Sequence, residues 1–580
     1  MTTTTNSRAE YQRWLDSPTL SDAQWQELND IAENDAEIES RFYAPLEFGT
    51  AGLRGVMAVG LHCMNDHVVR HATQSFAEVI IESGTDAREK GVVICFDCRE
   101  HSEEFAREAA CVMAANGIHV RLFDALRPTP ELSFAIRHFG AAAGINVTAS
   151  HNTKEYNGYK VYWSDGAQLP PKKADEVAAK MAEIDIFSGC STMPYEDAVA
   201  AGRIELIGEE VDEAFLACVM AQSIDASPVQ RMADRLEIVY TPFHGAGYKL
   251  IPEVLGRLGV TKFLPVAAQM RVDGSFPTVT SPNPENAEGF ALALQLAKEH
   301  GSPLIIGSDP DSDRLGVAVR DHNGEYVILS GNQVGVLLLD YILTAKAARG
   351  ELPEKALAIK TIVTTEMARE VCRAAGVRME ETFTGFKFIV GRLEELKQAG
   401  YQFLMGYEES IGYLIGDFVR DKDAVTAAMM VAEMTAWHME QGRSLLDALD
   451  ALYARLGWFE ERTVNLVMPG LDGLKKMRAL MNSLREAPPE EIAGERVLRM
   501  RDYLSGHVLV PGIGNVERTP ISGSDVLYFE LADGTNFIAR PSGTEPKIKV
   551  YVLAKGENRA ETAGRAAKYE AFAKSLPEMV

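Results

Sequence analysis

The chain has no long apolar stretch and little cysteine. The first residues, MTTTTNSRAEYQRW, lack the hydrophobic segment of a signal peptide, and no run approaches the ~18 consecutive apolar residues of a membrane-spanning helix. The seven cysteines are odd in number and irregularly spaced, which argues against a disulfide framework. Cys95 and Cys98 form a CxxC, but no second CxxC completes a zinc site. The sequence therefore predicts a cytoplasmic protein with no membrane partner.

Positively charged residues are also fewer than negatively charged ones. Lysine and arginine number 58 against 83 aspartates and glutamates, which gives a formal net charge of −25. A general nucleic-acid binder needs cations to displace counterions from the phosphate backbone, so we expect no nucleic-acid partner. The 46% hydrophobic and 24% charged residues are typical of a globular protein. At about 150 residues per domain, the 580 residues predict roughly four domains.

Two well-known catalytic and phosphate-binding motifs are missing. The sequence contains neither a GxSxG elbow nor the glycine-lysine signature of a Walker A loop. Ser150 is followed by His151, but neighbouring side chains on an extended chain point in opposite directions. We therefore do not expect this pair to form part of a hydrolase triad. Taken alone, the segment is typical of a turn at a strand end with a capping serine.

An acidic, helical segment opens the chain. The first 50 residues carry ten acidic and three basic side chains. Ser21 followed by Gln24 matches a helix capping box and predicts a polar helix that runs through Glu39. We assign residues 1–40 to an N-terminal helical extension.

Short apolar runs then alternate with helical patterns, which is typical of α/β layers. Three regions share this pattern, with the predicted strands VVICFD, HVRLFD and GINVTAS, then LEIVYTPF, TKFLPVAAQ and SPLIIGSDP, then LAIKTIVTT and QFLMGYEES. The last region differs, because VLYFEL, a turn at Asp533-Gly534, NFIAR and KIKVYVLA predict a hairpin followed by another strand. Residues 486–495 are loop-like and fall between helical patterns. The predicted fold class is α/β, with three related α/β domains and a smaller C-terminal α+β domain.

The loop after SPLIIG carries three alternating aspartates. Asp309, Asp311 and Asp313 can reach one hard cation, and oxygen ligands suit magnesium. An EF-hand would need glycine and glutamate at the positions that hold Arg314 and Arg320, so calcium is disfavoured. A haloacid-dehalogenase-type phosphatase, with Asp309 as nucleophile, remains an alternative. A solvated acidic turn is less consistent with the apolar strand before it.

Two further loops have polar side chains suited to a sugar phosphate. Gly406-Tyr407-Glu408-Glu409-Ser410 offers acceptors for sugar hydroxyls, although paired glutamates at a strand end are common. Residues 540–546, Arg-Pro-Ser-Gly-Thr-Glu-Pro, combine a guanidinium, hydroxyls and flexible backbone N–H groups. An oxyanion requires these groups, so this loop predicts phosphate binding.

Together these loops resemble the α-D-phosphohexomutase superfamily of phosphoglucomutases and phosphomannomutases. The matching motifs, in chain order, are TASHN, SDPDSDR, GYEES and RPSGTEP, with support from residues 49–55 (GTAGLRG) and Asp97-Cys98-Arg99. The chain's length and its helical extension resemble the longer phosphoglucomutase and phosphopentomutase branch. Two departures sit beside the sugar motif: Ile411-Gly412-Tyr413 follows Ser410 where many relatives carry histidine, and Ala424 follows Asp423 where many carry glycine.

The resemblance implies four domains around a central active-site cleft, the first three with mixed sheets. We place the domain with the serine loop at residues 41–205, the metal domain at 206–325, the sugar domain at 326–455 and the phosphate domain at 456–580.

The resemblance also implies roles for individual residues. Ser150 would carry the transferable phosphoryl group and complete the Mg²⁺ shell of Asp309, Asp311 and Asp313. Proton transfer and charge stabilisation near the reacting hydroxyl would fall to Arg54, Lys160 and Lys422. An arginine stays protonated and suits phosphate better, whereas a lysine is easier as acid or base. Substrate would contact Glu408, Ser410, Lys387 and Arg314, and the phosphate that does not react would bind Arg540, Ser542, Gly543 and Thr544.

The predicted enzyme is an isomerase that interconverts glucose 1-phosphate and glucose 6-phosphate through a phosphoserine and glucose 1,6-bisphosphate. Phosphomannomutase and phosphopentomutase activities on the same scaffold are the nearest alternatives. A metal-dependent aspartyl phosphatase and a non-catalytic sugar-phosphate sensor are alternatives of a different class. The expected partner is a small-molecule sugar phosphate, and the chain is expected to be a monomer or homodimer.

Overall fold

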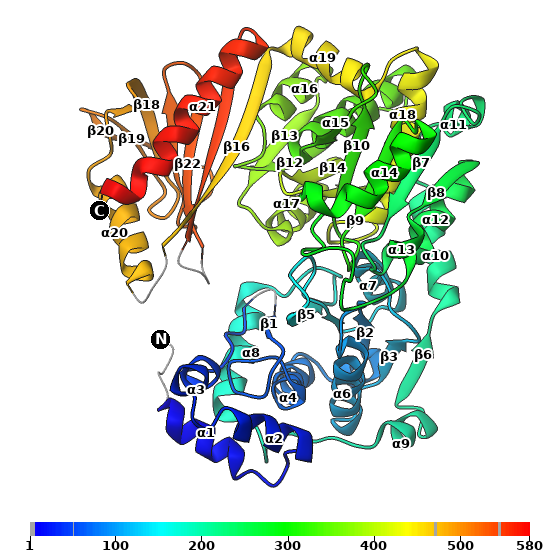
Figure 1. The fold of residues 1–580 in the computed structure, drawn as a ribbon, viewed down its shortest axis with the longest axis vertical. Helices are drawn as coiled ribbons and strands as arrows, with labels where there is room; N and C mark the ends of the chain where they lie inside the picture. The colour runs from blue at the N-terminus through cyan, green and yellow to red at the C-terminus, as the bar shows by residue number, and fades with distance from the viewer. Residues whose placement is uncertain (1–5, 50–51, 469–471, 543–546, 580) are drawn as a thin grey trace. The chain divides into compact units, whose positions relative to one another are not determined.

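The structure is a computed structural model, and Figure 1 shows its helices and strands. They divide into two compact units. The first unit comprises Met1–Ser330 and Ser410–Gly442, and the second comprises Gly331–Glu409 and Arg443–Val580. The first unit is therefore built from two separate stretches of chain. The structure describes residues 6–49, 52–468, 472–542 and 547–579.

Three short helices open the chain, α1 (Ser7–Leu15), α2 (Asp22–Asp30) and α3 (Asp35–Phe42). The predicted capping box is confirmed, because Ser21 and Gln24 form both of its reciprocal hydrogen bonds. The predicted single helix through Glu39 is wrong. Helix α2 ends at Asp30, and Asn34 caps a new helix by accepting a hydrogen bond from the N–H of Glu37.

Aromatic side chains attach this extension to the domain that follows. Trp14 is fully buried, and three rings lie edge-on to it, those of Phe42, His67 and Phe187. His67 belongs to α4 (Asp66–Glu82), so the extension and the first α/β domain share one hydrophobic core. Edge-to-face ring pairs stabilise by about 0.5–1.5 kcal/mol beyond their area burial.

The first α/β domain has a six-stranded mixed sheet in the order β1-β5-β4-β2-β3-β6. Its strands are β1 (Leu53–Val56), β2 (Val92–Phe96), β3 (Val120–Phe123), β4 (Ala143–Val147), β5 (Tyr156–Trp163) and β6 (Ile204–Ile207). β2, β3, β4 and β6 are parallel, whereas β5 runs antiparallel to both β4 and β1. Helix α7 (Thr129–Phe139) packs against β2 and β4. Buried parallel strands explain why these segments are so apolar.

The second α/β domain has a five-stranded mixed sheet in the order β11-β10-β9-β7-β8. Its strands are β7 (Glu237–Thr241), β8 (Lys262–Pro265), β9 (Leu304–Ser308), β10 (Leu315–Arg320) and β11 (Tyr326–Leu329). β7 pairs in parallel with β8 and β9, whereas β10 runs antiparallel to β9 and β11.

A helix from far along the chain completes this second domain. Helix α18 (Ala424–Glu440) packs against α12 (Gly247–Leu258), β9 and β10. Most of its side chains are buried, as expected for a helix that is apolar on nearly every face. This packing explains why residues 410–442 belong to the first unit.

The third α/β domain has parallel strands β12 (Ala356–Thr361), β13 (Arg378–Thr382) and β14 (Gln402–Glu408), with β12 between the other two. Helices α15 (Gly331–Ala348) and α17 (Phe386–Gln398) pack against β14. The predicted strands LAIKTIVTT and QFLMGYEES are confirmed in their apolar parts, and each prediction runs on into a loop. Ligand sites in such sheets lie at the carboxyl ends of strands like β12 and β14.

The C-terminal domain is an antiparallel sheet covered by two helices, α20 (Gly473–Glu486) and α21 (Arg559–Ser575). The predicted hairpin is confirmed, with its turn at Asp533-Gly534 between two of the strands. The sheet order is β16 (Trp458–Val467), β23 (Lys547–Gly556), β22 (Asn536–Pro541), β21 (Leu527–Leu531), β18 (Glu495–Asp502), β19 (His507–Val510) and β20 (Gly514–Arg518).

One prediction for this domain is wrong. Residues 486–495 do not lie between two helices, because strand β18 follows them. The segment itself contains a short strand, β17 (Glu491–Ile492), which turns back and pairs with β18. The alternation of charged and apolar residues in this region reflects an antiparallel sheet with one solvated face.

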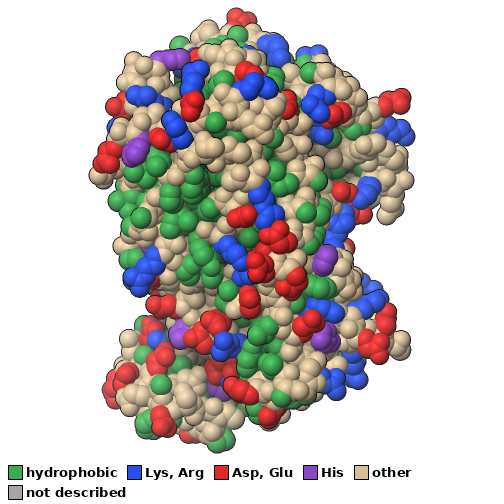
Figure 2. Space-filling view, turned by 90° about the vertical axis from the view of Figure 1, so that its right-hand side faces the viewer, with side chains coloured by type: hydrophobic (Ala, Val, Ile, Leu, Met, Phe, Trp, Pro, Cys, Tyr) green, Lys and Arg blue, Asp and Glu red, His purple; other side chains and the backbone are tan. Residues whose placement is uncertain are grey.

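The predicted fold class is confirmed, since three α/β domains are followed by a smaller domain with an antiparallel sheet. The domain boundaries given above stay predictions. No helix in the described residues has both the length and the apolar composition required to cross a membrane. On the face shown in Figure 2, acidic and basic side chains are interspersed.

His67 is expected to make the first unit less stable as the pH falls from 7 to 5. Burial lowers the pKa of His67 from its ordinary value of 6.5, so below about pH 6.5 the unfolded chain binds more protons than the folded chain. The contribution of His67 is therefore complete above that pH and is lost as the pH falls through the folded-state pKa. His67→Phe should show a smaller loss in the free energy of unfolding between pH 7 and 5, measured by chemical denaturation.

The matched control is His322→Phe, at an exposed histidine of the same unit. It should keep the wild-type pH dependence. An unchanged pH dependence in His67→Phe would contradict the prediction.

Candidate active site

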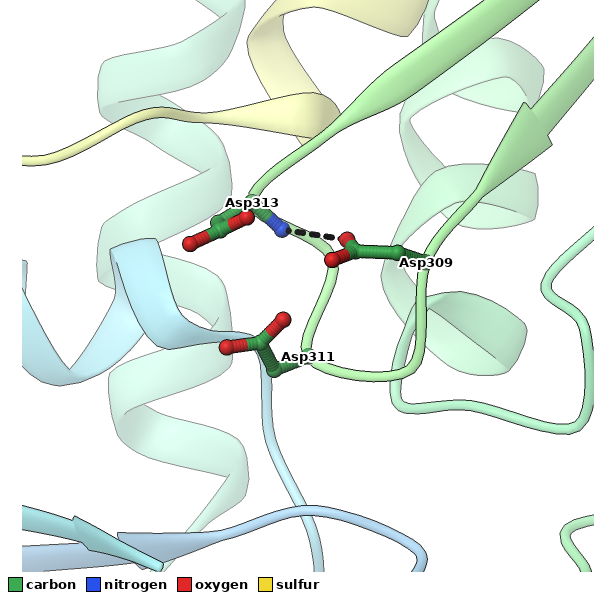
Figure 3. A group of neighbouring side chains, drawn as sticks. All are labelled: Asp309, Asp311 and Asp313. Atoms are coloured by element: carbon green, nitrogen blue, oxygen red, sulfur yellow. Dashed lines mark hydrogen bonds between the residues drawn. The ribbon is translucent and has the colours of Figure 1, made fainter. Parts of the chain in front are cut away.

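The aspartate loop, residues 308–314, is a tight turn between β9 and β10. Its first aspartate closes the turn, because Asp309 Oδ1 accepts hydrogen bonds from the N–H groups of Asp313 (3.1 Å) and Arg314 (3.0 Å). Ser312 adopts a left-handed conformation with φ of 53°, which bends the chain back towards β10. The loop therefore presents three aspartates from a short, fixed stretch of backbone (Figure 3).

The predicted aspartate triad is brought together. Asp309, Asp311 and Asp313 each offer an oxygen within 4.8 Å of the others, and all three are buried. Asp311 Oδ1 and Asp313 Oδ1 have no hydrogen-bond partner within the described protein. A buried carboxylate oxygen without a partner is costly, and hard oxygen ligands suit Mg²⁺. The residues present therefore fit a magnesium site.

The pKa values within the triad diverge. Burial, together with the charges of Asp311 and Asp313, raises the pKa of Asp309 well above its ordinary value. Burial acts in the same direction on Asp311, but the charge of Lys160 and the hydrogen bonds with Lys160, Asp309 and Thr129 together outweigh burial and lower the pKa of Asp311. A bound cation would relieve the repulsion within the cluster.

Ser150 lies directly beside the triad. Its Oγ donates a hydrogen bond to Asp309 Oδ2 at 2.8 Å, and its N–H donates to Thr148 Oγ1 at 2.8 Å. The expectation that Ser150 and His151 point apart is wrong, because Ser150 is not extended. Its φ of 51° is left-handed and brings its Oγ to 3.2 Å from His151 Nδ1.

The serine loop, residues 148–155, ends where β5 begins and is stabilised by Asp97 and Arg99 of the predicted supporting motif. Arg99 is buried and donates to the carbonyls of Ser150 (2.7 Å), Thr153 (2.8 Å) and Tyr156 (2.9 Å). Asp97 accepts a hydrogen bond from Thr148 Oγ1 at 2.6 Å. One guanidinium thus satisfies several carbonyls of a loop that forms no regular structure.

Two predicted lysines lie in the same unit and contact the triad. Lys160 Nζ, on β5, lies 2.6 Å from Asp311 Oδ2 and 3.6 Å from Asp313 Oδ2. Lys422 Nζ lies 3.1 Å from Asp313 Oδ2. Both side chains are almost fully buried, so these ion pairs are poorly screened by solvent.

The two predicted arginines of this unit lie nearby. Arg54, on β1, donates from Nη1 to Asn152 Oδ1 of the serine loop at 3.0 Å. Arg314 Nη1 donates to the backbone carbonyl of Ser410 at 3.3 Å, and its Nε lies 3.8 Å from Asp313 Oδ1. The serine loop and the aspartate loop therefore each have a guanidinium beside them.

The residues that support Asp311 were not predicted from the sequence. Thr129, at the start of α7, donates from Oγ1 to Asp311 Oδ2 at 2.8 Å and from its N–H to the Asp311 carbonyl at 2.8 Å. Asn146 Nδ2 in turn donates to Thr129 Oγ1 at 2.7 Å. The only available signal was the Thr129-Pro130 pair, which is typical of a helix start and carries no hint of a distant aspartate.

The sugar loop, residues 406–410, begins within β14, and along the chain the first unit resumes at Ser410. Glu408 Oε1 accepts a hydrogen bond from the Gly385 N–H at 2.6 Å, just before α17. Lys387 lies in the first turn of that helix, and burial lowers its pKa. Burial and the neighbouring Glu408 raise the pKa of Glu409 to about 7. The second unit therefore brings Glu408 close to the segment that holds Lys387.

Arg540 and Ser542 of the phosphate loop lie at the end of β22. The N–H of Ser542 donates to the Lys547 carbonyl at 2.8 Å, which closes the loop. Arg540 is the cross-strand partner of Lys549 on β23. Like charges at directly opposed positions repel, so this pair favours an anion nearby. Gly543 and Thr544 lie outside the described residues.

Comparisons with known proteins agree with this arrangement. Three family descriptions match: phosphoglucomutase/phosphomannomutase alpha/beta/alpha domain I over residues 45–186, domain II over 213–324 and domain III over 330–456. The phosphoglucomutase of Staphylococcus aureus strain N315 is 36% identical over 533 residues, which cover 90% of this chain and 92% of that protein. The protein of strain RF122, also named phosphoglucomutase, is 36% identical over 541 residues, or 92% and 94% of the two chains.

Solved structures share the fold at low sequence identity. The Paramecium phosphoprotein pp63/parafusin, a phosphoglucomutase in an open form, has a TM-score of 0.69 at 16% identity and covers 93% of this chain and 95% of its own. A Burkholderia thailandensis protein of the phosphoglucomutase/phosphomannomutase family has a TM-score of 0.63 at 18% identity, with coverages of 91% and 97%. The four motifs, the clustered aspartates and these relatives agree: the chain belongs to the phosphoglucomutase/phosphomannomutase family of the α-D-phosphohexomutase superfamily.

Proposed function

We propose that this protein is a phosphoglucomutase that interconverts glucose 1-phosphate and glucose 6-phosphate through a phosphoserine and glucose 1,6-bisphosphate. The observation that carries the proposal is the contact between Ser150 Oγ and Asp309 Oδ2 within a buried aspartate triad. A phosphate on this serine would project towards the carboxylates that suit a cation. The two phosphoglucomutases at 36% identity support glucose as the sugar.

The proposed cofactor is Mg²⁺, held by Asp309, Asp311 and Asp313 together with the phosphate on Ser150. When bound, the ion would draw charge from the phosphoryl oxygens and make Ser150 a better leaving group. Phosphoryl transfer depends mainly on positioning and on neutralising the charge of the equatorial oxygens. Thr129 and the backbone of the aspartate loop supply that positioning, since they fix Asp311 and Asp309 by hydrogen bonds.

In the first step the bond between Ser150 Oγ and phosphorus breaks, and a bond forms between phosphorus and a free hydroxyl of the sugar monophosphate. The departing Ser150 Oγ takes a proton from an ammonium group, for which Lys160 and Lys422 are the candidates, and the amine so formed takes the proton of the attacking hydroxyl. Arg54 remains protonated and stabilises the charge on the phosphoryl group. The resulting glucose 1,6-bisphosphate turns around, and its other phosphate returns to Ser150.

The remaining predicted residues hold the substrate in either orientation. Glu408 would accept hydrogen bonds from sugar hydroxyls, and Ser410 would donate or accept them. Lys387 and Arg314 would provide cationic contacts. Arg540 and Ser542 would hold the phosphate that does not react, together with Gly543 and Thr544. A site of this kind binds either phosphate, so both isomers can be held during one cycle.

The aspartyl phosphatase is less consistent with the geometry. Asp309 would have to be the nucleophile, but its Oδ1 already accepts two backbone N–H groups and its Oδ2 accepts the Ser150 hydroxyl. A sensor without activity would not require a serine beside the triad. We propose a cytoplasmic enzyme, which is consistent with seven free cysteines, and a monomer or homodimer.

Replacement of Ser150 should abolish isomerisation. Ser150→Ala removes the only proposed phosphoryl carrier, so kcat should fall by about 10³-fold or more. The measurements are a coupled assay of glucose 6-phosphate formation and mass spectrometry after incubation with glucose 1,6-bisphosphate and Mg²⁺. Wild-type protein should gain one phosphate, on Ser150.

The matched control is Ser188→Ala, at an exposed serine of the same unit, which should retain full activity. A Ser150→Ala enzyme that still isomerises glucose 1-phosphate would rule out the phosphoserine route. Phosphate release in place of isomerisation would favour the phosphatase.

Removal of a triad charge should weaken magnesium binding. Asp311→Asn and Asp313→Asn each remove a proposed hard ligand, so we expect Mg²⁺ affinity to fall by at least about tenfold in calorimetric titrations. Asp175→Asn, at an exposed aspartate of the same unit, provides the control and should bind Mg²⁺ like the wild type. Equal affinity in all three variants would place the metal elsewhere.

Substrate preference separates the proposed activity from its nearest relatives. We expect kcat/KM for glucose 1-phosphate to exceed the values for mannose 1-phosphate and ribose 1-phosphate by about tenfold or more, which is roughly 1.4 kcal/mol of transition-state discrimination. The three substrates should be compared in one assay primed with the corresponding bisphosphates. A higher value for mannose or for the pentose would reassign the enzyme within its family.

A further inference from the structure

Lys422 is held at two points. Its Nζ lies 3.1 Å from Asp313 Oδ2 in the aspartate loop and 3.0 Å from Asp421 Oδ1, the residue before it in the chain. The first carboxylate belongs to the proposed metal site. The second carboxylate is not part of the triad and has no role in the mechanism above.

Asp421 is completely buried and is fixed from another part of the fold. Its Oδ2 accepts hydrogen bonds from Tyr162 Oη at 3.0 Å and from Gln168 Nε2 at 3.1 Å. Its Oδ1 also accepts the N–H of Lys422 at 2.8 Å. Tyr162 lies on β5, the strand that carries Lys160, so the first α/β domain fixes the orientation of this carboxylate.

The side chain of Lys422 packs against Gly412 in space that a larger residue would fill. A Cβ placed on Gly412 would lie 2.3 Å from Lys422 Cδ and 2.9 Å from its Cγ, distances too short for any real contact. Around Gly412, the Ile411 carbonyl accepts the Leu315 N–H at 3.1 Å, and the Ser312 carbonyl accepts the Ala424 N–H at 3.2 Å. The backbone is therefore fixed to the start of β10 at Ile411 and to the aspartate loop at Ala424.

A buried charge is retained only where it has partners, because desolvating a carboxylate costs several kcal/mol. Tyr162 and Gln168 could be satisfied by a neutral acceptor, so their hydrogen bonds alone do not require a carboxylate. The ammonium of Lys422, in contrast, requires a negatively charged carboxylate beside it. Asp421 and Asp313 share that ammonium, so without Asp421 the ammonium would bind more strongly to the Asp313 oxygen that the proposed cation needs.

We infer that Asp421, fixed by Tyr162 and Gln168, is a positioning residue that holds the Lys422 ammonium beside the aspartate triad, along a path kept open by Gly412. The inference rests on the proposed function, because it gives Lys422 a task in phosphoryl transfer. Among the described residues, Asp421 is hydrogen-bonded to Tyr162, Gln168 and Lys422, and none of these bonds involves the triad or Ser150.

The test is a double-mutant cycle between Asp421 and Lys422, with two readouts. Asp421→Asn keeps an acceptor for Tyr162 and removes the charge. In the mutase assay it should lower kcat by about tenfold with KM changed less than about threefold, and in the Lys422→Met background it should lower kcat by less than about twofold. A merely structural role predicts the same loss in both backgrounds.

Magnesium affinity, measured by calorimetry, gives a readout that does not depend on activity. Asp421→Asn should weaken Mg²⁺ binding by about fivefold, because the ammonium then binds Asp313 more strongly and competes with the cation. In the Lys422→Met background the effect should fall below about twofold. Equal weakening in both backgrounds would overturn the inference. A wild-type protein that binds Mg²⁺ but does not isomerise sugar phosphates would contradict the proposed function without contradicting this inference. The Mg²⁺ affinities of the double-mutant cycle would still test the role of Asp421.

Two further variants guard against a folding defect. Gln168→Leu keeps the Asp421 charge and removes one of its donors, so kcat should fall by a smaller factor than in Asp421→Asn. Gly412→Ala should displace Lys422 and lower kcat with no change of charge, whereas Gly256→Ala, at a helical glycine with open space around its Cβ position, should behave like wild type. Full activity in Gly412→Ala would overturn the steric part of the inference. Melting temperatures of all variants show whether each one is folded.

Discussion

The active site depends on one electrostatic constraint. Three carboxylates are buried with oxygen atoms within 4.8 Å of one another. Such a cluster is unstable without cations, and the fold surrounds it with them. Lys160 and Lys422 approach from two stretches of chain that are more than 250 residues apart, and Arg314 lies at the end of the loop itself. The requirement for charge balance therefore explains why distant segments converge on residues 308–314. It also explains how a chain with a net charge of −25 can handle an anionic substrate.

Much of the fold could be predicted from local patterns. Apolar runs such as VVICFD and LEIVYTPF are long enough and β-branched enough to identify buried strands, and the Asp533-Gly534 turn identifies a hairpin. The failures occurred where the pattern was ambiguous. The break after Asp30 depends on a capping asparagine within a polar helix pattern, and strand β18 alternates charged and apolar residues over only a few positions.

The candidate site was predictable where chemistry is concentrated in a short motif. The three aspartates are separated by single residues, so their convergence follows from the sequence alone. The resemblance to a family supplied the pairing of Ser150 with these aspartates, which no local pattern indicates. The left-handed backbone at Ser150 could not be predicted, because serine rarely adopts it, and the expectation for His151 failed for this reason. Thr129 was missed because Asp311 lies far away in the chain, and Asp421 was missed because Tyr162 and Gln168, which fix it, are also distant in sequence.

The division of the first unit into two stretches has a consequence for synthesis of the protein. The second α/β domain is completed by α18, which the ribosome makes only after the strands and helices of the third domain. Until then, the apolar surfaces of α12, β9 and β10 that α18 covers have no partner. Domains generally fold as units during synthesis, and transiently exposed apolar surface promotes aggregation. The second α/β domain therefore cannot complete its hydrophobic core until the third domain has been synthesised. A fragment that ends at residue 330 lacks α18 and would not fold as a stable protein.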